Sequence, residues 1–542
     1  MGVPSFSHGF RQAALAAGVA LAIALPALAG PAAAQAVLHR GNSAEPQTLD
    51  QAHTSIDIEA NILKDLYEGL TVYDAAGTIQ PGAAESWTIS DDGLVYTFKL
   101  RDAANWSNGD PVTAGDFVFS FRRIEDPATA AGYANILYPI KNAEAINTAT
   151  ADAPVAVDTL GVRAVDDKTL EITLERPTPY FLELMAHQTA LPVNQKAVEQ
   201  FGADFVKPGN LVSNGAFTLT EQVANDHITV SKNPNYWGAA DVKLDQVIFY
   251  PTDDQAAAVR RFQAGELDLN YYFPTDQTAF LREQLGEDQV HLTPSLSVYY
   301  YALDGRQPPF DDVRVRRALS MAIDRDFLSE SVFSGSQLPL YSFVPPGIAG
   351  YEPAAADYAA MSQLDREDMA KQLLTEAGYG EGGKPLTIEI RYNTNANHEK
   401  VAVAVADMWK ALGATVSIVN LDTSAHYAYL QEGGAFNAAR AGWQADYADA
   451  ENFLGMYVST NKTFNYGEYN NPEYDRLMIA SYAERDPAAR AKLLHDAEAL
   501  LMAEQGTAPL MVTANPWLVS RKVKGWEDNS ANEHLSRYLS LE

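Results

Sequence analysis

Hydrophobic patterns of two kinds alternate along this chain, and that alternation restricts its fold more than any other feature. Residues 95–100 and 169–174 alternate apolar and polar side chains, which is typical of half-buried strands. Further on, residues 386–390 predict a strand, residues 398–412 a helix, and residues 414–419 another strand. Helices and strands interleaved in this way favour α/β units with partly parallel sheets.

The N-terminal segment predicts export from the cytoplasm. Arg11 is the one fixed side-chain charge before the apolar run 13–25, and the small residues 32–34 fit a cleavage site before Gln35. We expect a cleavable signal peptide at residues 1–34, with cleavage after Ala36 as the alternative. The apolar run is shorter than the ~20 residues that span a bilayer. Because no cysteine follows it, anchoring through a lipid-modified cysteine is not expected either.

Charge and composition exclude several classes of function. The chain has 39 Lys and Arg against 70 Asp and Glu, and its formal net charge is -31. This balance argues against a nucleic-acid partner, because phosphate binding needs clustered cations. The absence of cysteine excludes disulfides, cysteine-ligated zinc, iron-sulfur clusters and thiol nucleophiles. We find no HExxH, GxSxG or EF-hand motif, so no catalytic residue, metal site or cofactor is expected.

Seven short motifs, in the same order along the chain, carry a resemblance to a known family. They are residues 65–70, 84–87, 106–117, 214–217, 233–237, 308–318 and 439–447. The block that begins WSNGDPVTA at Trp106 is typical of the wider peptide, nickel and opine-binding family. The block ARAGWQADY at Ala439 is typical of its oligopeptide branch. The chain therefore resembles the extracytoplasmic oligopeptide-binding proteins of ABC importers.

This resemblance implies an α/β fold of the periplasmic-binding-protein type II class. Two lobes would close on a ligand like a flytrap, and an extra, smaller α/β domain would lie beside lobe I. The expected boundaries are 37–67, 195–232 and 514–542 for lobe I, 68–194 for the additional domain and 233–513 for lobe II.

The resemblance also assigns a ligand-binding role to particular residues. Asp446 would bind the α-ammonium group of a peptide, for which a carboxylate is suitable because charge-assisted hydrogen bonds are strong. The peptide backbone would pair with residues 441–444 and with the segment 54–58. Arg440 and His398 match positions that can meet the peptide carboxylate. The full set of expected ligand-binding residues is Ser55, Asp57, Tyr133, Tyr271, Tyr272, Tyr300, His398, Arg440, Ala441, Gly442, Trp443, Gln444 and Asp446.

Without the resemblance, these residues have ordinary structural interpretations. Trp443 and the tyrosines would be core or surface aromatics, and Arg440 and Asp446 an ion pair or helix cap. His398 would be a residue near the N-terminus of a helix.

Some positions depart from the family pattern. Ser297 and Gln444 stand where some members have a cysteine pair. Phe333 stands where a lysine meets the carboxylate of longer peptides, and Ser55 where an acidic residue lies near the first crossing between lobes. The specificity for the carboxyl end of the ligand is therefore open.

Together these observations predict a monomeric periplasmic receptor that binds short peptides and delivers them to the membrane permease of an ABC transporter. Such a receptor does no chemistry on its ligand. One alternative is a specialist receptor for murein peptide, another modified peptide, an opine or a metal chelate. A second alternative is a secreted peptide hydrolase or chaperone. The sequence leaves open the preferred peptide length, the side-chain preference, the affinity and the identity of the permease.

Overall fold

The elements predicted from periodicity are present at the expected places. A computed structural model describes residue 2 and residues 35–54, 56–380 and 382–542. Within these residues the predicted elements correspond to β5 (Val95–Leu100), β7 (Thr169–Thr173), β15 (Thr387–Asn393), α11 (Ala396–Ala411) and β16 (Thr415–Leu421). The predicted signal peptide, apart from residue 2, lies outside the described residues, and so does Ser55.

Twelve strands of the described residues form one mixed sheet. Besides β15 and β16 these are β1 (Val37–Gly41), β8 (Phe217–Val223), β9 (His227–Lys232), β10 (Gln246–Tyr250), β11 (Leu269–Tyr271), β12 (Val290–Pro294), β13 (Ser297–Leu303), β14 (Gln337–Pro339), β17 (Ala438–Gln444) and β18 (Thr507–Val519). Their order is β16-β15-β17-β13-β18-β11-β1-β10-β9-β8, and β12 and β14 also pair with β18.

The predicted parallel pairing is confirmed at β15 and β16. These strands run parallel with Ile388 opposite Val416, and α11 connects one to the other. Val405 and Trp409 of α11 are buried in the same apolar cluster as Ile388. A helix is expected in this connection, because parallel strands need a crossover of a dozen or more residues.

A smaller α/β unit contains a second sheet. Four antiparallel strands are arranged as β4-β5-β7-β6, where β4 spans Ala84–Ile89 and β6 spans Val162–Asp166. Helix α2 (Ala114–Glu125) begins with a capping box formed by Thr113 and Asp116. This unit lies within residues 68–194, where the resemblance places the additional domain.

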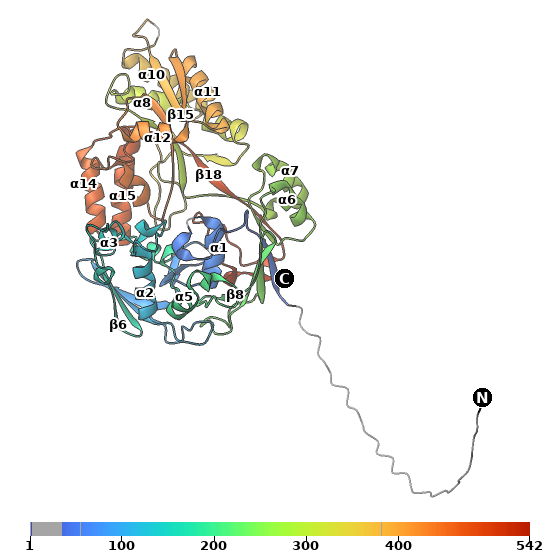
Figure 1. The fold of residues 1–542 in the computed structure, drawn as a ribbon. Coiled ribbons are helices and arrows are strands. Elements are labelled where there is room, and N and C mark those ends of the chain that lie inside the picture. Colours follow the sequence, from blue (N-terminus) through green and yellow to red (C-terminus); the bar gives the residue numbers. More distant parts are fainter. Residues whose placement is uncertain (1, 3–34, 55, 381) are drawn as a thin grey trace. The chain divides into compact units, whose positions relative to one another are not determined.

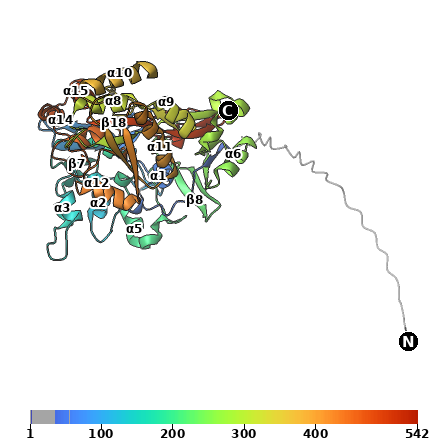
Figure 2. The ribbon, with the colours of Figure 1, turned by 90° about the horizontal axis from the view of Figure 1, so that it is seen from above.

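The other helices and short strands lie between and around the sheets (Figure 1). They are α1 (Asp57–Leu66), α3 (Ala143–Asn147), α4 (Phe181–Leu184), α5 (Gln195–Phe201), α6 (Gln255–Gln263), α7 (Thr278–Leu285), α8 (Val313–Met321), α9 (Arg325–Phe327), α10 (Gln363–Glu376), α12 (Thr423–Gln431), α13 (Glu451–Leu454), α14 (Pro472–Ala483), α15 (Pro487–Ala503), β2 (Thr71–Tyr73), β3 (Ile79–Pro81), β19 (Val523–Lys524) and β20 (Ser540–Leu541). In both ribbon views α6 lies at the opposite end from α14 and α15 (Figures 1 and 2).

Strand β18 belongs to both halves of the large sheet. Up to Thr513 it pairs with β13 and β14, and from Ala514 onward with β12 and β11. The buried apolar residues are divided in the same way. Those from Leu296 to Val512 form clusters separate from the cluster that contains the residues from Leu38 to Phe249. The strand β10 pairs with β1, although it lies within the range expected for lobe II. The lobe boundaries stay a prediction. These pairings favour a boundary between the two lobes near residue 294 over the expected boundary at residue 233.

Several of the family-like motifs meet in one buried network around Glu68, which is 1% exposed. Arg537 forms an ion pair with Glu68, and Tyr236 and Trp237 donate hydrogen bonds of 2.5 and 2.7 Å to its two carboxylate oxygens. The side chain of Asn214 accepts from the backbone N–H of Glu68 at 3.0 Å. These motif residues therefore stabilise the scaffold and do not line the cavity described below.

The end of α2 provides a test of stability against pH. Glu125 is 0% exposed, neither carboxylate oxygen has a hydrogen-bond partner among the described residues, and burial raises its pKa from 4.5 to about 8. Between pH 4.5 and 8 the unfolded chain releases this proton while the folded chain keeps it, so stability falls as pH rises through this range. Glu125→Gln should therefore gain roughly 1–3 kcal/mol relative to wild type on going from pH 5 to pH 8.5.

Thermal unfolding of both proteins at the two pH values measures this gain. A difference between wild type and variant that stays constant from pH 5 to pH 8.5 would contradict the assignment.

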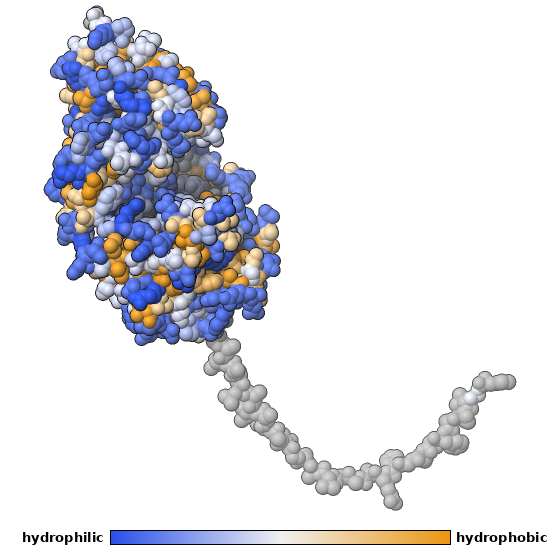
Figure 3. All heavy atoms as spheres, turned by 60° about the vertical axis from the view of Figure 1, so that its left-hand side comes forward, coloured by the Kyte–Doolittle hydropathy of each residue, from blue (hydrophilic) through white to orange (hydrophobic). Residues whose placement is uncertain are grey.

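The surface carries hydrophilic residues over most of the face in Figure 3, with hydrophobic residues scattered among them, and this face is hollowed near its middle. Among the described residues, no helix has the length and apolar character needed to cross a bilayer.

Candidate functional site

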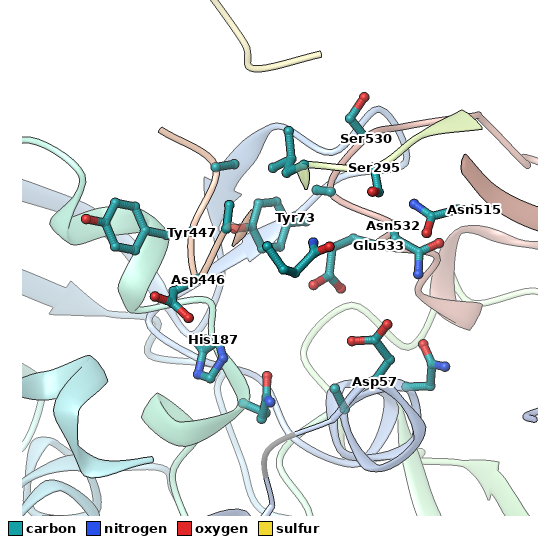
Figure 4. A pocket seen from close by; sticks show the side chains of 18 of the residues that line it. Asp57, Tyr73, His187, Ser295, Asp446, Tyr447, Asn515, Ser530, Asn532 and Glu533 are labelled. Atoms are coloured by element: carbon teal, nitrogen blue, oxygen red, sulfur yellow. The ribbon is translucent and has the colours of Figure 1, made fainter. Parts of the chain in front are cut away.

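A cavity of about 350 Å³ lies beside α1, between the end of β17 and the second half of β18 (Figure 4). Side chains from α1, from the smaller α/β unit, from the turn after β17 and from the C-terminal segment 530–533 line it. Its size is that of a site for a small ligand. Four carboxyl groups and one lysine line this cavity, so its net charge depends on which of these groups are ionised and paired.

Asp446 lies two residues after the end of β17 and presents its carboxylate to the cavity (Figure 4). The hydroxyl of Tyr133 donates to Asp446 Oδ1 at 2.8 Å, and Asn452 Oδ1 accepts from the backbone N–H of Asp446 at 3.3 Å. Burial and the charge of Asp446 raise the pKa of Tyr133, so Tyr133 stays a neutral donor. No lysine, arginine or histidine of the described residues forms an ion pair with Asp446. Its negative charge is therefore available to a ligand cation.

His187 contributes no positive charge beside Asp446. Its ring stacks on Tyr133 with centroids 5.5 Å apart, and burial, with the charge of Lys64 adding to it, lowers the pKa of His187 to about 3. At neutral pH the imidazole is uncharged.

The remaining charged groups of the cavity divide into one pair and two single carboxyl groups. Lys64 and Glu533 form an ion pair. Burial raises the pKa of Glu183 to about 8, so this carboxyl is largely protonated at neutral pH. Asp57 accepts a hydrogen bond of 3.0 Å from the hydroxyl of Tyr271 and has no cationic partner among the described residues. With Asp446, the cavity carries two uncompensated carboxylates.

Six of the predicted residues line this cavity, namely Asp57, Tyr133, Tyr271, Tyr272, Gln444 and Asp446. Ala441, Gly442 and Trp443 lie next to it on β17 without lining it. Trp443 donates from Nε1 to Asn452 Oδ1 at 2.7 Å, so the side chain of Asn452 connects it to the backbone of Asp446.

Tyr300, which the resemblance places in the cleft, does not line this cavity. It is 0% exposed and packs edge-on against Phe343 with ring centroids 5.1 Å apart. Successive side chains of a strand point to opposite faces. On β13 it is therefore Tyr299, and not Tyr300, that faces the guanidinium of Arg440, which lies 4.7 Å from the Tyr299 ring centroid. Tyr299 is therefore the aromatic residue next to Arg440.

Arg440 and His398 meet in a second cluster, outside the cavity of Asp446. Both contact Tyr299, whose ring lies 5.4 Å from that of His398. Arg440 donates to Tyr427 Oη at 2.9 Å and to Asn393 Oδ1 at 3.2 Å, and no carboxylate of the described chain pairs with it. Burial, with Arg440 and His426 adding to it, lowers the pKa of His398 to about 4. This cluster therefore holds one uncompensated cation next to a neutral imidazole.

Phe333 joins this second cluster as an apolar residue. It is 4% exposed and packs edge-on against Tyr299 with ring centroids 6.0 Å apart.

Several cavity residues were not predicted from the sequence. They are Lys64, Tyr73, Glu183, His187, Ser295, Tyr447, Asn515, Asn532 and Glu533. Lys64 and Glu533 are 469 residues apart in the chain. No local pattern connects such residues. His187 alone stands out, as a polar residue after the mostly apolar segment 181–186, which is a weak signal for a site.

A family model described as bacterial extracellular solute-binding proteins, family 5 (middle), matches residues 78–465. The chain belongs to this family. Among the similar proteins, the periplasmic oligopeptide-binding protein OppA of Haemophilus influenzae is 39% identical over 500 residues, which are 91% of each chain. The family predicted from the sequence is confirmed by this match, and the α/β two-lobed fold class is confirmed by the solved structures of relatives.

Two solved structures of family 5 proteins allow a comparison of arrangement. The unliganded open form of the periplasmic murein tripeptide binding protein MppA has a TM-score of 0.89, with 38% identity, over 94% of this chain and 98% of that one. The complex of Haemophilus influenzae OppA with the peptide RPPGFSPFR has a TM-score of 0.66 at the same identity, over 94% and 99%. Because the identities are equal, the scores indicate that the described part of the chain from residue 36 onward resembles the open form of MppA more than the peptide complex of OppA.

Proposed function

We propose that this chain is an extracytoplasmic receptor that captures short peptides and delivers them to the permease of an ABC importer. The observation that carries the proposal is the carboxylate of Asp446 at the end of a strand with a free edge. Strand β15 pairs with β17 only at Ala438 and Ala439, so the edge from Arg440 to Gln444 has no strand partner among the described residues. A peptide that adds as a strand needs such an edge for its backbone and an anion for its ammonium group.

The second cluster supplies a counterpart for the other end of a peptide. Within the described part of the chain Arg440 has no carboxylate partner, and a guanidinium can bind a carboxylate with two hydrogen bonds. Phe333 brings no charge to this cluster. Arg440 therefore meets the peptide carboxylate in this proposal, with the neutral His398 as an additional hydrogen-bonding group.

The proposal extends to the location and the partners of the protein. The signal-peptide pattern at residues 1–34 and the periplasmic relatives support release into the periplasm after cleavage, without a lipid anchor. A monomer that docks on a membrane permease is the form we expect. The protein does not alter its ligand.

Its likeness to MppA makes a murein peptide the second candidate ligand. Native mass spectrometry of the mature protein, purified from its periplasm without denaturation, separates the two. We expect a ladder of bound masses that sequencing resolves into peptides of a few residues. A single dominant mass of a cell-wall peptide would instead make the protein a specialist. Chromatography of a peptide kept with the protein for hours should show the intact peptide, and its loss would favour a hydrolase.

A further inference from the structure

The turn that carries Asp446 contacts a part of the molecule to which it does not belong. This turn follows β17, whereas Tyr180 precedes α4 in the smaller α/β unit. We infer that Tyr180 is a positioning residue for peptide binding, because its ring stacks on Tyr447 and so holds the neighbouring Asp446 in place. The inference rests on the proposed function, in which Asp446 binds the ammonium group of the peptide.

The stack joins two nearly parallel rings. The centroids of Tyr180 and Tyr447 are 4.1 Å apart, and the planes of the two rings differ by 9°. Tyr180 is 7% exposed and belongs to the buried apolar cluster of the smaller unit. It follows Pro177 and Pro179, whose rings restrict the backbone dihedral φ. The position of the Tyr180 ring is therefore set by the smaller unit.

Tyr447 is the residue through which the second half of the chain packs on that cluster. Among the described apolar residues from 296 to 512, it alone packs against the cluster that contains Tyr180. The buried apolar residues of this range form clusters of their own. An aromatic pair is stabilised by the area that it buries and by the interaction of its rings. The contact therefore fixes the turn after β17 to the smaller unit.

The rest of Tyr447 is held by its own segment. Its hydroxyl donates to Glu451 Oε2 at 2.7 Å, and the hydroxyl of Tyr482 donates to Glu451 Oε1 at 2.8 Å. The backbone N–H of Asp449 donates to the carbonyl oxygen of Tyr447 at 2.9 Å, and Arg490 donates to both carboxylate oxygens of Asp449. These bonds fix the hydroxyl and the backbone of Tyr447, and the stack fixes the face of its ring.

Asp446 itself is held by two hydrogen bonds, from its backbone N–H to Asn452 at 3.3 Å and from Tyr133 to its carboxylate at 2.8 Å. Tyr133 also belongs to the smaller unit. Figure 4 shows Tyr447 beside Asp446 at one end of the cavity. The stack is present in an arrangement that resembles an unliganded open form, so it does not depend on a bound peptide. A carboxylate positioned in advance lowers the cost of ordering the site on binding.

Titration calorimetry of the mature protein with Ala-Ala-Ala, free or acetylated at its amino end, tests the inference. The measured quantity is the ratio of the two affinities, because a general loss of structure weakens both forms alike. In Tyr180→Leu this ratio should fall about tenfold relative to wild type. Tyr180→Phe keeps the ring and should restore the ratio to within about twofold. Tyr447→Leu should act like Tyr180→Leu, and the double variant should lose no more than either single variant.

Tyr138→Leu is the matched control. Tyr138 lies in the smaller unit, where its hydroxyl donates to Asn147 Oδ1 at 2.9 Å, so its loss should leave the ratio unchanged. Melting temperatures show that each variant is folded, and if one leucine variant does not fold, the other decides.

Three results overturn the positioning role while peptide binding itself stands. They are an unchanged ratio in a folded leucine variant, a ratio that Tyr180→Phe fails to restore, and effects that add in the double variant. If the free peptide does not bind wild type, or binds no better than the acetylated one, the proposed capture of the ammonium group is overturned together with the inference.

Discussion

Asp446→Asn is expected to weaken the binding of peptides with a free amino terminus on the order of 100-fold. The ammonium group would lose the carboxylate that it pairs with while remaining inside the cavity, and a buried charge without a partner is costly. The shape of the site should be kept, because asparagine has the same size and can still accept the hydrogen bond from Tyr133. Titration calorimetry with one tripeptide, free or acetylated at its amino end, measures the effect.

The acetylated peptide provides the internal comparison. It should bind wild type about as weakly as the free peptide binds Asp446→Asn, and the variant should not distinguish the two forms. Glu473→Gln removes an exposed carboxylate of α14 that pairs with Arg476, and it should leave both affinities unchanged. Wild-type affinity of Asp446→Asn for the free peptide would show that the amino end is bound elsewhere.

Arg537→Met is expected to lower the free energy of unfolding by about 3–5 kcal/mol. Glu68 would keep its two hydrogen bonds from Tyr236 and Trp237 but would become a buried carboxylate without a cation. Urea denaturation followed by circular dichroism measures the loss as a shift of the midpoint.

A double variant separates the buried charge from the lost packing. Glu68→Gln combined with Arg537→Met should be destabilised by less than the sum of the two single variants, because no unpaired charge remains. Arg476→Met breaks an exposed ion pair and should cost at most about 1 kcal/mol. If Arg476→Met lowered the free energy of unfolding as much as Arg537→Met does, burial of the Glu68–Arg537 pair would not explain the effect of Arg537→Met.

Local patterns were sufficient for the elements and for part of the site. The strand β5 and the helix α11 were predicted because period-2 and period-3.6 patterns are encoded by consecutive residues. Asp446 could be named because it lies within the family-like motif 439–447, and Tyr133 because the overall resemblance implied its position. Their hydrogen bond of 2.8 Å joins residues 313 apart in the chain, which no periodicity predicts.

The face to which a residue points needed the structure. The sequence contains a run of three consecutive tyrosines, Tyr299, Tyr300 and Tyr301. Only the pairing of β13 with β17 and β18 decides which of these rings contacts Arg440 and which packs in the core. The same holds for Tyr272, whose positive φ places its ring beside that of Tyr271.

Composition, local periodicity and short motifs were sufficient to predict the α/β class, the acidic character and the family, because none of these depends on which residues meet in space. Tertiary structure alone decided that Lys64 is engaged by Glu533, that Asp57 and Asp446 remain uncompensated in one cavity, and that β18 serves both halves of the sheet. Charge compensation depends on which residues become neighbours in space. Those neighbours come from segments hundreds of residues apart, so the cavity exists only once the chain has folded.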